Sequence, residues 1–354
     1  MGQKEIKYLL FFTLAINAAF AQAQSLPASS PQSTLPRTSP SLPQPVPAAD
    51  VPVHDPVMIR QDSVYYIYCT GWGISVWSSR DRKEWTKEPS VFSQPPQWAV
   101  AAIPGFKGHI WAPDISYHNG RYYLYYAVST FGKNSSCIGF AINRTLHTDS
   151  PDYHWEDQGK VIQSIPGRDM WNAIDPNLEM DDNGTPWLAF GSFWNGIKLV
   201  RLNEDLRTPA QPEQWYTIAA RPRSAGLPDT VAGDAAIEAP FLFKKDRYFY
   251  LFVSFDYCCR GEKSTYKMMV GRSEKIQGPY LDKDGRPMTQ GGGSLVLEGD
   301  SNWYGVGHNA VVTFEDGDWL VFHGYDAHDK GKSKLRMEPL RWVDDWPVVK
   351  NVSQ

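Results

Sequence analysis

The stretch HDPVMIRQDSVYYIYC, residues 54–69, places an Asp-Pro pair directly before two alternating runs that flank a polar turn. Asp-Pro is a common way to begin a turn, and Gln61-Asp62 sits where a hairpin turn would lie. A single copy of this pattern predicts a hairpin and nothing more. Its meaning depends on whether the pattern recurs.

The pattern recurs four times along the chain. Each copy is a short strand, a polar turn and an aromatic-rich alternating strand. The later copies are APDISYHNGRYYLYYA (112–127), IDPNLEMDDNGTPWLAF (174–190), EAPFLFKKDRYFYLFV (238–253) and HNAVVTFEDGDWLVFH (308–323). The position of Pro56 becomes Pro113, Pro176, Pro240 and Asn309, which are 57 to 69 residues apart. Five strand-only units of this size predict an all-β fold, a five-bladed β-propeller.

Further strand candidates follow the hairpins. Residues 73–87, 137–145, 196–203 and 266–274 would supply the outer strands of four blades, whereas the fifth blade, with residues 334–343, looks shorter. A helical solenoid is disfavoured because no segment keeps a 3.6-residue apolar period.

The ends of the chain have a different composition. Residues 1–24 combine Lys4 and Lys7 with a short apolar run and small-x-small cleavage sites, the pattern of a secretory signal peptide. Residues 25–52 hold eight prolines and no aromatic residue, which predicts an extended tether. We therefore expect a propeller over residues 53–349, a tail at 350–354, and secretion to the extracellular space, or to the periplasm of a Gram-negative bacterium.

Four acidic or histidine residues share one position in the repeats. In a propeller the innermost strands surround a central axis, so the entry residues Asp55, Asp175, Glu238 and His308 should face one pore. Repulsion among carboxylates raises at least one pKa, which an acid catalyst needs. The alternative is a structural ion that plugs the pore, which accounts for His308 and Asp175 better than for Glu238.

Composition restricts the partners. The net charge of −4 and pI of about 6.1 give no basic footprint for nucleic acid. Aromatic residues make up 14% of the chain, which suits either sugar binding or the packing of an all-β core. We expect a monomer without a nucleic-acid or membrane partner.

Several motifs together resemble glycoside hydrolase family 43, most closely its endo-α-1,5-L-arabinanases. They are HDP (54–56), WAPDI (111–115), NAIDP (172–176), GSFWNGIKL (191–199), EAPFL (238–242), FDYCCRG (255–261), GGGSLVLEG (291–299) and GHNAVV (307–312). The resemblance implies a five-bladed propeller and inverting hydrolysis, with Asp55 as general base, Asp175 as pKa modulator and Glu238 as general acid. Inversion needs two carboxyl groups roughly 6.5–9.5 Å apart, and acids from the first and fourth blades can lie across the pore.

The resemblance also extends to ligand-binding residues. His308 matches a histidine that holds a calcium or similar ion, with water completing the shell; a hydrogen-bonded pore histidine is the alternative. Trp111 and Phe131 match aromatic positions that line the substrate cleft, where core packing is the competing interpretation. Arg260 could hold the acid or a sugar hydroxyl, or form a surface salt bridge. Pairing of the adjacent Cys258 and Cys259 stays open, and no organic cofactor is expected.

The leading functional hypothesis is a secreted endo-arabinanase that cuts arabinan, the side chains of pectin, or arabino-oligosaccharides. An exo-acting arabinofuranosidase or β-xylosidase of the same fold is the nearest alternative. A non-catalytic glycan-binding propeller is the other alternative, but it has no need of a proton donor.

Overall fold

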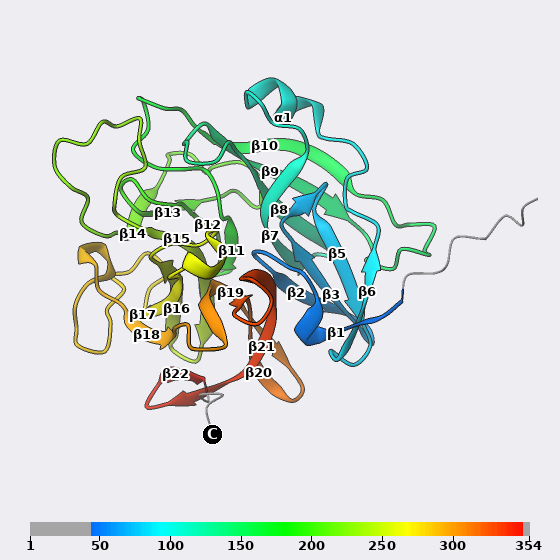
Figure 1. Ribbon diagram of the computed structural model, residues 1–354. Coiled ribbons are helices and arrows are strands. Elements are labelled where there is room, and N and C mark those ends of the chain that lie inside the picture. Colours follow the sequence, from blue (N-terminus) through cyan, green and yellow to red (C-terminus); the bar gives the residue numbers. More distant parts are fainter. Residues whose placement is uncertain (1–43, 350–354) are drawn as a thin grey trace, which may run out of the picture. The chain divides into compact units, whose positions relative to one another are not determined.

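The computed structural model describes residues 44–349, in which five antiparallel sheets are arranged around a common centre (Figure 1). The five hairpins recognised in the sequence each form the inner part of one sheet. The prediction of a five-bladed β-propeller is confirmed.

In four blades the innermost strand is the first strand of the repeat. In blade 2 the first strand of the repeat is β7, and the short β4 pairs with it on the side opposite to β8. Blade 1 contains β1 (Val46–Pro47), β2 (Val57–Gln61), β3 (Val64–Cys69), β5 (Ser75–Ser79) and β6 (Glu84–Glu88). Blade 2 contains β4 (Gly71–Trp72), β7 (His109–His118), β8 (Arg121–Val128), β9 (Ser136–Asn143) and β10 (Glu156–Ser164). Blade 3 contains β11 (Asn177–Met180), β12 (Pro186–Phe190), β13 (Ile197–Arg201) and β14 (Trp215–Ala219). Blade 4 contains β15 (Ile237–Lys245), β16 (Tyr248–Phe255), β17 (Lys267–Ser273) and β18 (Ser294–Leu297). Blade 5 contains β19 (Trp303–Phe314), β20 (Gly317–Asp326), β21 (Lys332–Val343) and β22 (Trp346–Val349).

Helices contribute little to the described residues. They are the single-turn segments η1 (Ala48–Asp50), η2 (Gly261–Lys263) and η3 (Met288–Gln290), and α1 (Gln97–Ala102) between blades 1 and 2. No helix within residues 44–349 has the length and apolar character needed to cross a membrane.

Two sequence predictions need correction. The fifth blade is not shorter: β22 pairs with β21 after a turn at Asp344-Asp345, two residues with positive φ that the sequence did not mark as a hairpin. The tether boundary after residue 52 is also too late. β1 pairs with β6 and so covers an otherwise open edge of the sheet of blade 1. Val51, which follows β1, is fully buried against blade 5. The predicted signal peptide, most of the tether and the C-terminal tail lie outside the described residues.

Each inner strand carries a bulge at the same place. Two residues oppose one on the neighbouring strand at Asp55-Pro56, Ala112-Pro113, Asp175-Pro176, Ala239-Pro240 and His308-Asn309, which we call the inner-strand bulges. The first residue of every pair has a positive φ, between 42° and 56°. Such backbone is uncommon for residues other than glycine and costs about 1–3 kcal/mol per residue.

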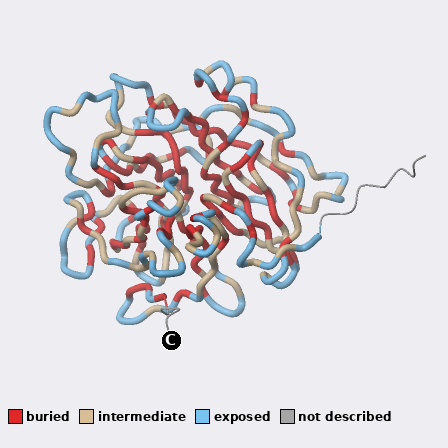
Figure 2. Tube along the Cα trace, viewed as in Figure 1, coloured by how far each residue is buried: buried red, intermediate tan, exposed pale blue. Residues whose placement is uncertain are grey.

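Buried apolar residues fill the interfaces between consecutive blades. Figure 2 shows that buried residues are concentrated along the strands and exposed residues in the loops. One cluster lies in each of the five interfaces. The last, which includes Ile67 of blade 1 and Val321 of blade 5, closes the ring. Because no strand is exchanged between blades 1 and 5, closure depends on this packing and on hydrogen bonds such as Leu335 N–H to Val51 O, at 2.9 Å.

We expect Leu124→Ala to destabilise the propeller by about 3–5 kcal/mol, the usual result of leaving a cavity where a leucine was fully buried. Leu124 is inaccessible to solvent in the cluster between blades 1 and 2. The midpoint of urea unfolding measures the effect. Leu295→Ala is the matched control, since Leu295 is 48% exposed and should change stability little. Equal midpoints for the two variants would contradict this account of the blade interface.

Candidate functional site

The inner-strand bulges gather the predicted catalytic residues. Asp55, Asp175 and His308 are the first residues of their bulges, but the equivalent residue in blade 4 is Ala239, so Glu238 lies one position earlier than the sequence comparison placed it. A bulge interrupts the alternation of side chains along a strand and re-aims them. Glu238 therefore reaches the site from the position that His54 occupies in blade 1.

Asp55 is buried and fully engaged. His54 Nδ1 lies 2.7 Å and His308 Nδ1 3.0 Å from its Oδ1, and Thr70 donates a hydrogen bond to its Oδ2 at 2.6 Å. Burial pushes the pKa of Asp55 upward, but His54 and His308 outweigh it and hold the pKa well below its usual range. Asp55 is thus an ionised carboxylate at neutral pH, the state that a general base requires.

Asp175 has the opposite character. Burial, together with repulsion from Glu238 and Asp55, raises its pKa to about 8, although His308 opposes the rise. Its Oδ2 accepts the Ala239 N–H at 3.0 Å, which places Asp175 beside Glu238. Asp175 therefore retains its proton at neutral pH, and with the neighbouring Glu238 it forms what we call the acid pair.

Glu238 is half-buried and held from two sides. Ser192 donates to its Oε2 at 2.7 Å, and Tyr266 donates to its Oε1 at 2.9 Å. Burial raises the pKa of Tyr266 well above its usual value, so its hydroxyl remains a donor. Gly307 makes room for this tyrosine, because a Cβ there would lie 2.1 Å from the ring.

The predicted sugar-binding residues have different surroundings. Trp111 is half-buried and donates from Nε1 to His109 Nδ1 at 2.9 Å, whereas Phe131 is 75% exposed after β8 and is not a core residue. Arg260 is exposed, and its guanidinium lies 3.9 Å from the centroid of the Tyr257 ring. Within the described residues Arg260 forms no ion pair, either with Glu238 or at the surface. Cys258 and Cys259 are joined by a disulfide, which the sequence had left open.

His308 is placed where a cation would be favoured. Burial lowers its pKa, but Asp55, Asp175 and Glu238 raise it to about 9 in the absence of an ion. The negative surroundings that favour a proton favour any cation. Nδ1 faces Asp55, which leaves Nε2 as the ring atom available to a ligand, the arrangement of a metal-bound histidine oriented by a carboxylate. The residues are therefore compatible with a mostly hydrated ion.

Sequence reasoning missed several residues that hold the acids. His54 and Ser192 stand inside the quoted motifs HDP and GSFWNGIKL. His323 ends the fifth repeat and Tyr325 lies two residues after it, but the residue types did not show which side chains any of the four would contact. Tyr266 carried no signal at all. Trp72 was also missed: it is 63% exposed, and its ring packs edge-on against His109, 5.7 Å between centroids.

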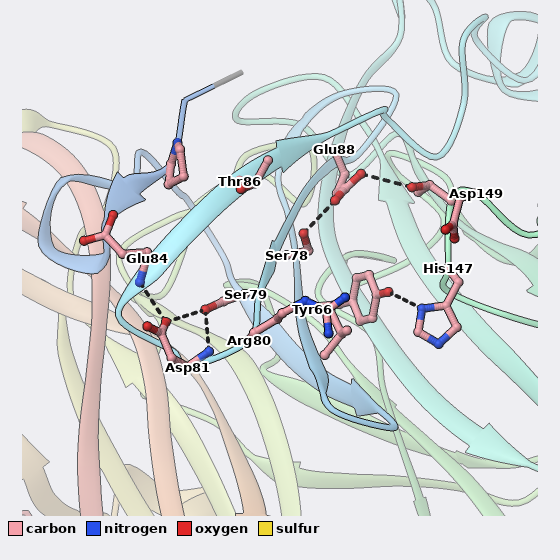
Figure 3. A pocket seen from close by; sticks show the side chains of 13 residues that line it. Tyr66, Ser78, Ser79, Arg80, Asp81, Glu84, Thr86, Glu88, His147 and Asp149 are labelled. Atoms are coloured by element: carbon pink, nitrogen blue, oxygen red, sulfur yellow. Dashed lines mark hydrogen bonds between the residues drawn. The ribbon is translucent and has the colours of Figure 1, made fainter. Parts of the chain in front are cut away.

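A cavity of about 500 Å³ lies elsewhere, at the outer side of blades 1 and 2 (Figure 3). Its walls include Glu88, Asp149 and the hydrogen-bonded pair Tyr66 and His147. It contains none of the candidate catalytic residues, so it is not the site that the propeller assembles.

Comparisons with known proteins agree with this geometry. The model of the family "Glycosyl hydrolases family 43" matches residues 43–347. The extracellular exo-alpha-(1->5)-L-arabinofuranosidase ArbA of Cellvibrio japonicus is 51% identical over 303 residues, covering 85% of this chain and 87% of that protein. The extracellular endo-alpha-(1->5)-L-arabinanase 1 of Bacillus subtilis is 44% identical over 299 residues, covering 83% and 87%.

Solved structures are similar as well. A Cellvibrio cellulosa alpha-L-arabinanase complexed with arabinohexaose superposes with a TM-score of 0.83 at 51% identity, covering 85% of this chain and 96% of that one. The endo-arabinanase of Bacillus licheniformis gives a TM-score of 0.76 at 44% identity, covering 85% and 98%. With a propeller of this form and a family match over nearly all described residues, the chain belongs to glycosyl hydrolases family 43.

Proposed function

We propose that this glycoside hydrolase degrades arabinan, cutting internal α-1,5-L-arabinofuranosidic bonds with inversion of configuration. The observation that carries the chemistry is the contrast between an ionised Asp55 and a protonated Asp175 that lies beside Glu238. The relatives named as arabinanases and as an arabinofuranosidase support the substrate class. These relatives are named as extracellular proteins, which together with the signal-peptide pattern of residues 1–24 supports secretion.

In this mechanism Asp55 takes a proton from a water molecule that attacks the anomeric carbon. Glu238 gives its proton to the leaving sugar oxygen on the other side of the bond. Ser192 and Tyr266 fix the orientation of the Glu238 carboxyl group. Asp175 accepts the N–H of Ala239 and so holds the backbone next to Glu238 in position.

Endo action is supported by exposed aromatic rings near the bulges. Trp72, His109 and Trp111 contact one another in a row beside Ala112, and Phe131 is exposed on the same blade. Several rings can hold more than one sugar of a chain, which internal cutting requires. Exo action is the second candidate, favoured by the name of the 51%-identical Cellvibrio japonicus relative.

Early digestion of linear 1,5-arabinan should yield oligosaccharides of many lengths and a rapid loss of viscosity, because internal bonds are cut at random. Chromatography of products at low conversion measures this. A single short product from the first minutes, at constant viscosity, would establish exo action instead. Hydrolysis of an aryl β-xyloside but not of arabinan would overturn the substrate class.

Glu238→Gln should reduce hydrolysis of arabinan roughly 10²- to 10⁴-fold, because the amide keeps the shape but carries no acidic proton. An aryl arabinofuranoside with a good leaving group needs little protonation, so its hydrolysis should fall much less. Glu298→Gln, at an exposed carboxylate, is the control and should behave as wild type. Equal losses on both substrates would remove Glu238 from the role of general acid.

A hydrated calcium ion held by His308 would supply positive charge beneath the three acids. Removing it with a chelator should lower the melting temperature, and added calcium should restore it; at a hundred times its dissociation constant a ligand adds about 2.7 kcal/mol. His308→Ala should abolish the response, whereas His154→Ala, at an exposed histidine, should retain it. A melting temperature indifferent to both chelator and calcium would exclude the ion.

A further inference from the structure

A continuous chain of hydrogen bonds leads from the Cys258–Cys259 disulfide to Asp55. The Cys259 N–H donates to the Tyr325 hydroxyl at 2.7 Å, and that hydroxyl lies 2.8 Å from His54 Nε2. His54 Nδ1 lies 2.7 Å from Asp55 Oδ1. The chain links blade 4, blade 5 and blade 1. The contacts that Tyr325 makes in it, with Cys259 and with His54, have no role in the mechanism described above.

The position of each proton in this chain follows from counting donors and acceptors. His323 Nδ1 accepts the Asp55 backbone N–H at 3.1 Å, so in the neutral ring the proton of His323 sits on Nε2. Burial lowers the pKa of His323 well below its usual value, which keeps that ring neutral. Its Nε2–H then points to the Tyr325 hydroxyl, 3.3 Å away.

Tyr325 receives donors from several sides and has one proton of its own to give. A phenol oxygen accepts through its lone pairs and donates one hydrogen. Burial raises the pKa of Tyr325, and bonds from the Cys259 N–H and the Ser264 hydroxyl oppose the rise, as donors to the phenol oxygen do. With these groups and the His323 Nε2–H donating to it, the tyrosine proton goes to His54 Nε2. With Nε2 accepting, His54 has its proton on Nδ1, which lies 2.7 Å from Asp55 Oδ1.

We propose that Tyr325 is a positioning residue of the reaction: by donating to His54 Nε2 it fixes the tautomer of His54 that donates to Asp55 and so aims the general base. The inference rests on the proposed role of Asp55. The other tautomer of His54 would turn a lone pair toward the carboxylate, and Asp55 would rotate away from its working orientation.

The surroundings keep the chain in place. Tyr325 is 3% exposed and His323 is inaccessible to solvent, and the rings of His54 and His323 are stacked with centroids 4.0 Å apart. The disulfide closes a small ring that includes the peptide bond between Cys258 and Cys259. This ring restricts the direction of the Cys259 N–H. The donor that orients Tyr325 is thus held by a covalent constraint.

The direct test is the tautomer of His54 in the intact protein. Two-bond proton–nitrogen correlation spectra of protein carrying ¹⁵N-histidine distinguish a proton on Nδ1 from one on Nε2, and His54→Asn identifies the signal. We expect Nδ1–H in the wild type and a mixture of tautomers in Tyr325→Phe. A wild-type His54 with its proton on Nε2 would overturn the proposal, whether or not the variant folds.

Kinetics test the consequence. Tyr325→Phe should lower kcat about 10- to 100-fold on both arabinan and an aryl arabinofuranoside, with KM within about twofold, because a misaimed base slows attack by water whatever the leaving group. Tyr304→Phe, a half-exposed tyrosine in the same blade, is the control and should be unchanged. Unchanged kcat in Tyr325→Phe would overturn the proposal.

A double-mutant cycle separates positioning from general damage to the fold. In His54→Asn the amide nitrogen can still donate to Asp55 but has no counterpart of Nε2, so adding Tyr325→Phe should change kcat less than about twofold. Full additivity of the two losses would refute the coupling. If wild-type protein does not hydrolyse arabinan, the proposed function fails, while the His54 spectra still decide the arrangement of the chain.

Discussion

The site depends on how the five inner-strand bulges satisfy their backbone N–H groups. In four of the five, the N–H of the positive-φ residue donates to a side chain of the preceding blade. The pairs are Ala112 to Thr70, Ala239 to Asp175, His308 to Ser254 and Asp55 to His323. A buried N–H without a partner costs about 1–3 kcal/mol, so these contacts lock each blade against its neighbour. The last pair joins blade 1 to blade 5 and completes the ring.

The same contacts tie stability to chemistry. Thr70 serves the Ala112 N–H and also Asp55, and Asp175 serves the Ala239 N–H while belonging to the acid pair. Strained backbone at these points is maintained by the surrounding structure, as is common where side chains must be aimed at a substrate. Asp55 and Asp175 are thus part of the framework that holds the blades together, which explains why both are buried.

Burial alone would raise the pKa of both Asp55 and Asp175. Asp55 escapes because His54 and His308 lie within hydrogen-bonding distance, whereas Asp175 has two carboxyl neighbours and a single backbone donor. The division of roles between base and acid is therefore a matter of partners rather than of residue type. Loops outside this framework, with rings such as Trp72 and Phe131, determine how a sugar chain reaches the acids and hence which bonds are cut.

The sequence by itself determined the number of blades and the inner hairpins, because the Asp-Pro repeat and strand alternation are local patterns, and from the same repeat it predicted the acids. It misplaced Glu238 by one position and made blade 5 too short, because residue types alone indicate neither the register of a bulge nor the turn at Asp344-Asp345. Only the tertiary structure decided that His54, Tyr266, His323 and Tyr325 surround the acids, and that Cys258 pairs with Cys259. Those contacts join residues up to 271 positions apart, as in His54 and Tyr325, and hydrogen-bond partners at such separations are set by the packing of whole blades against one another.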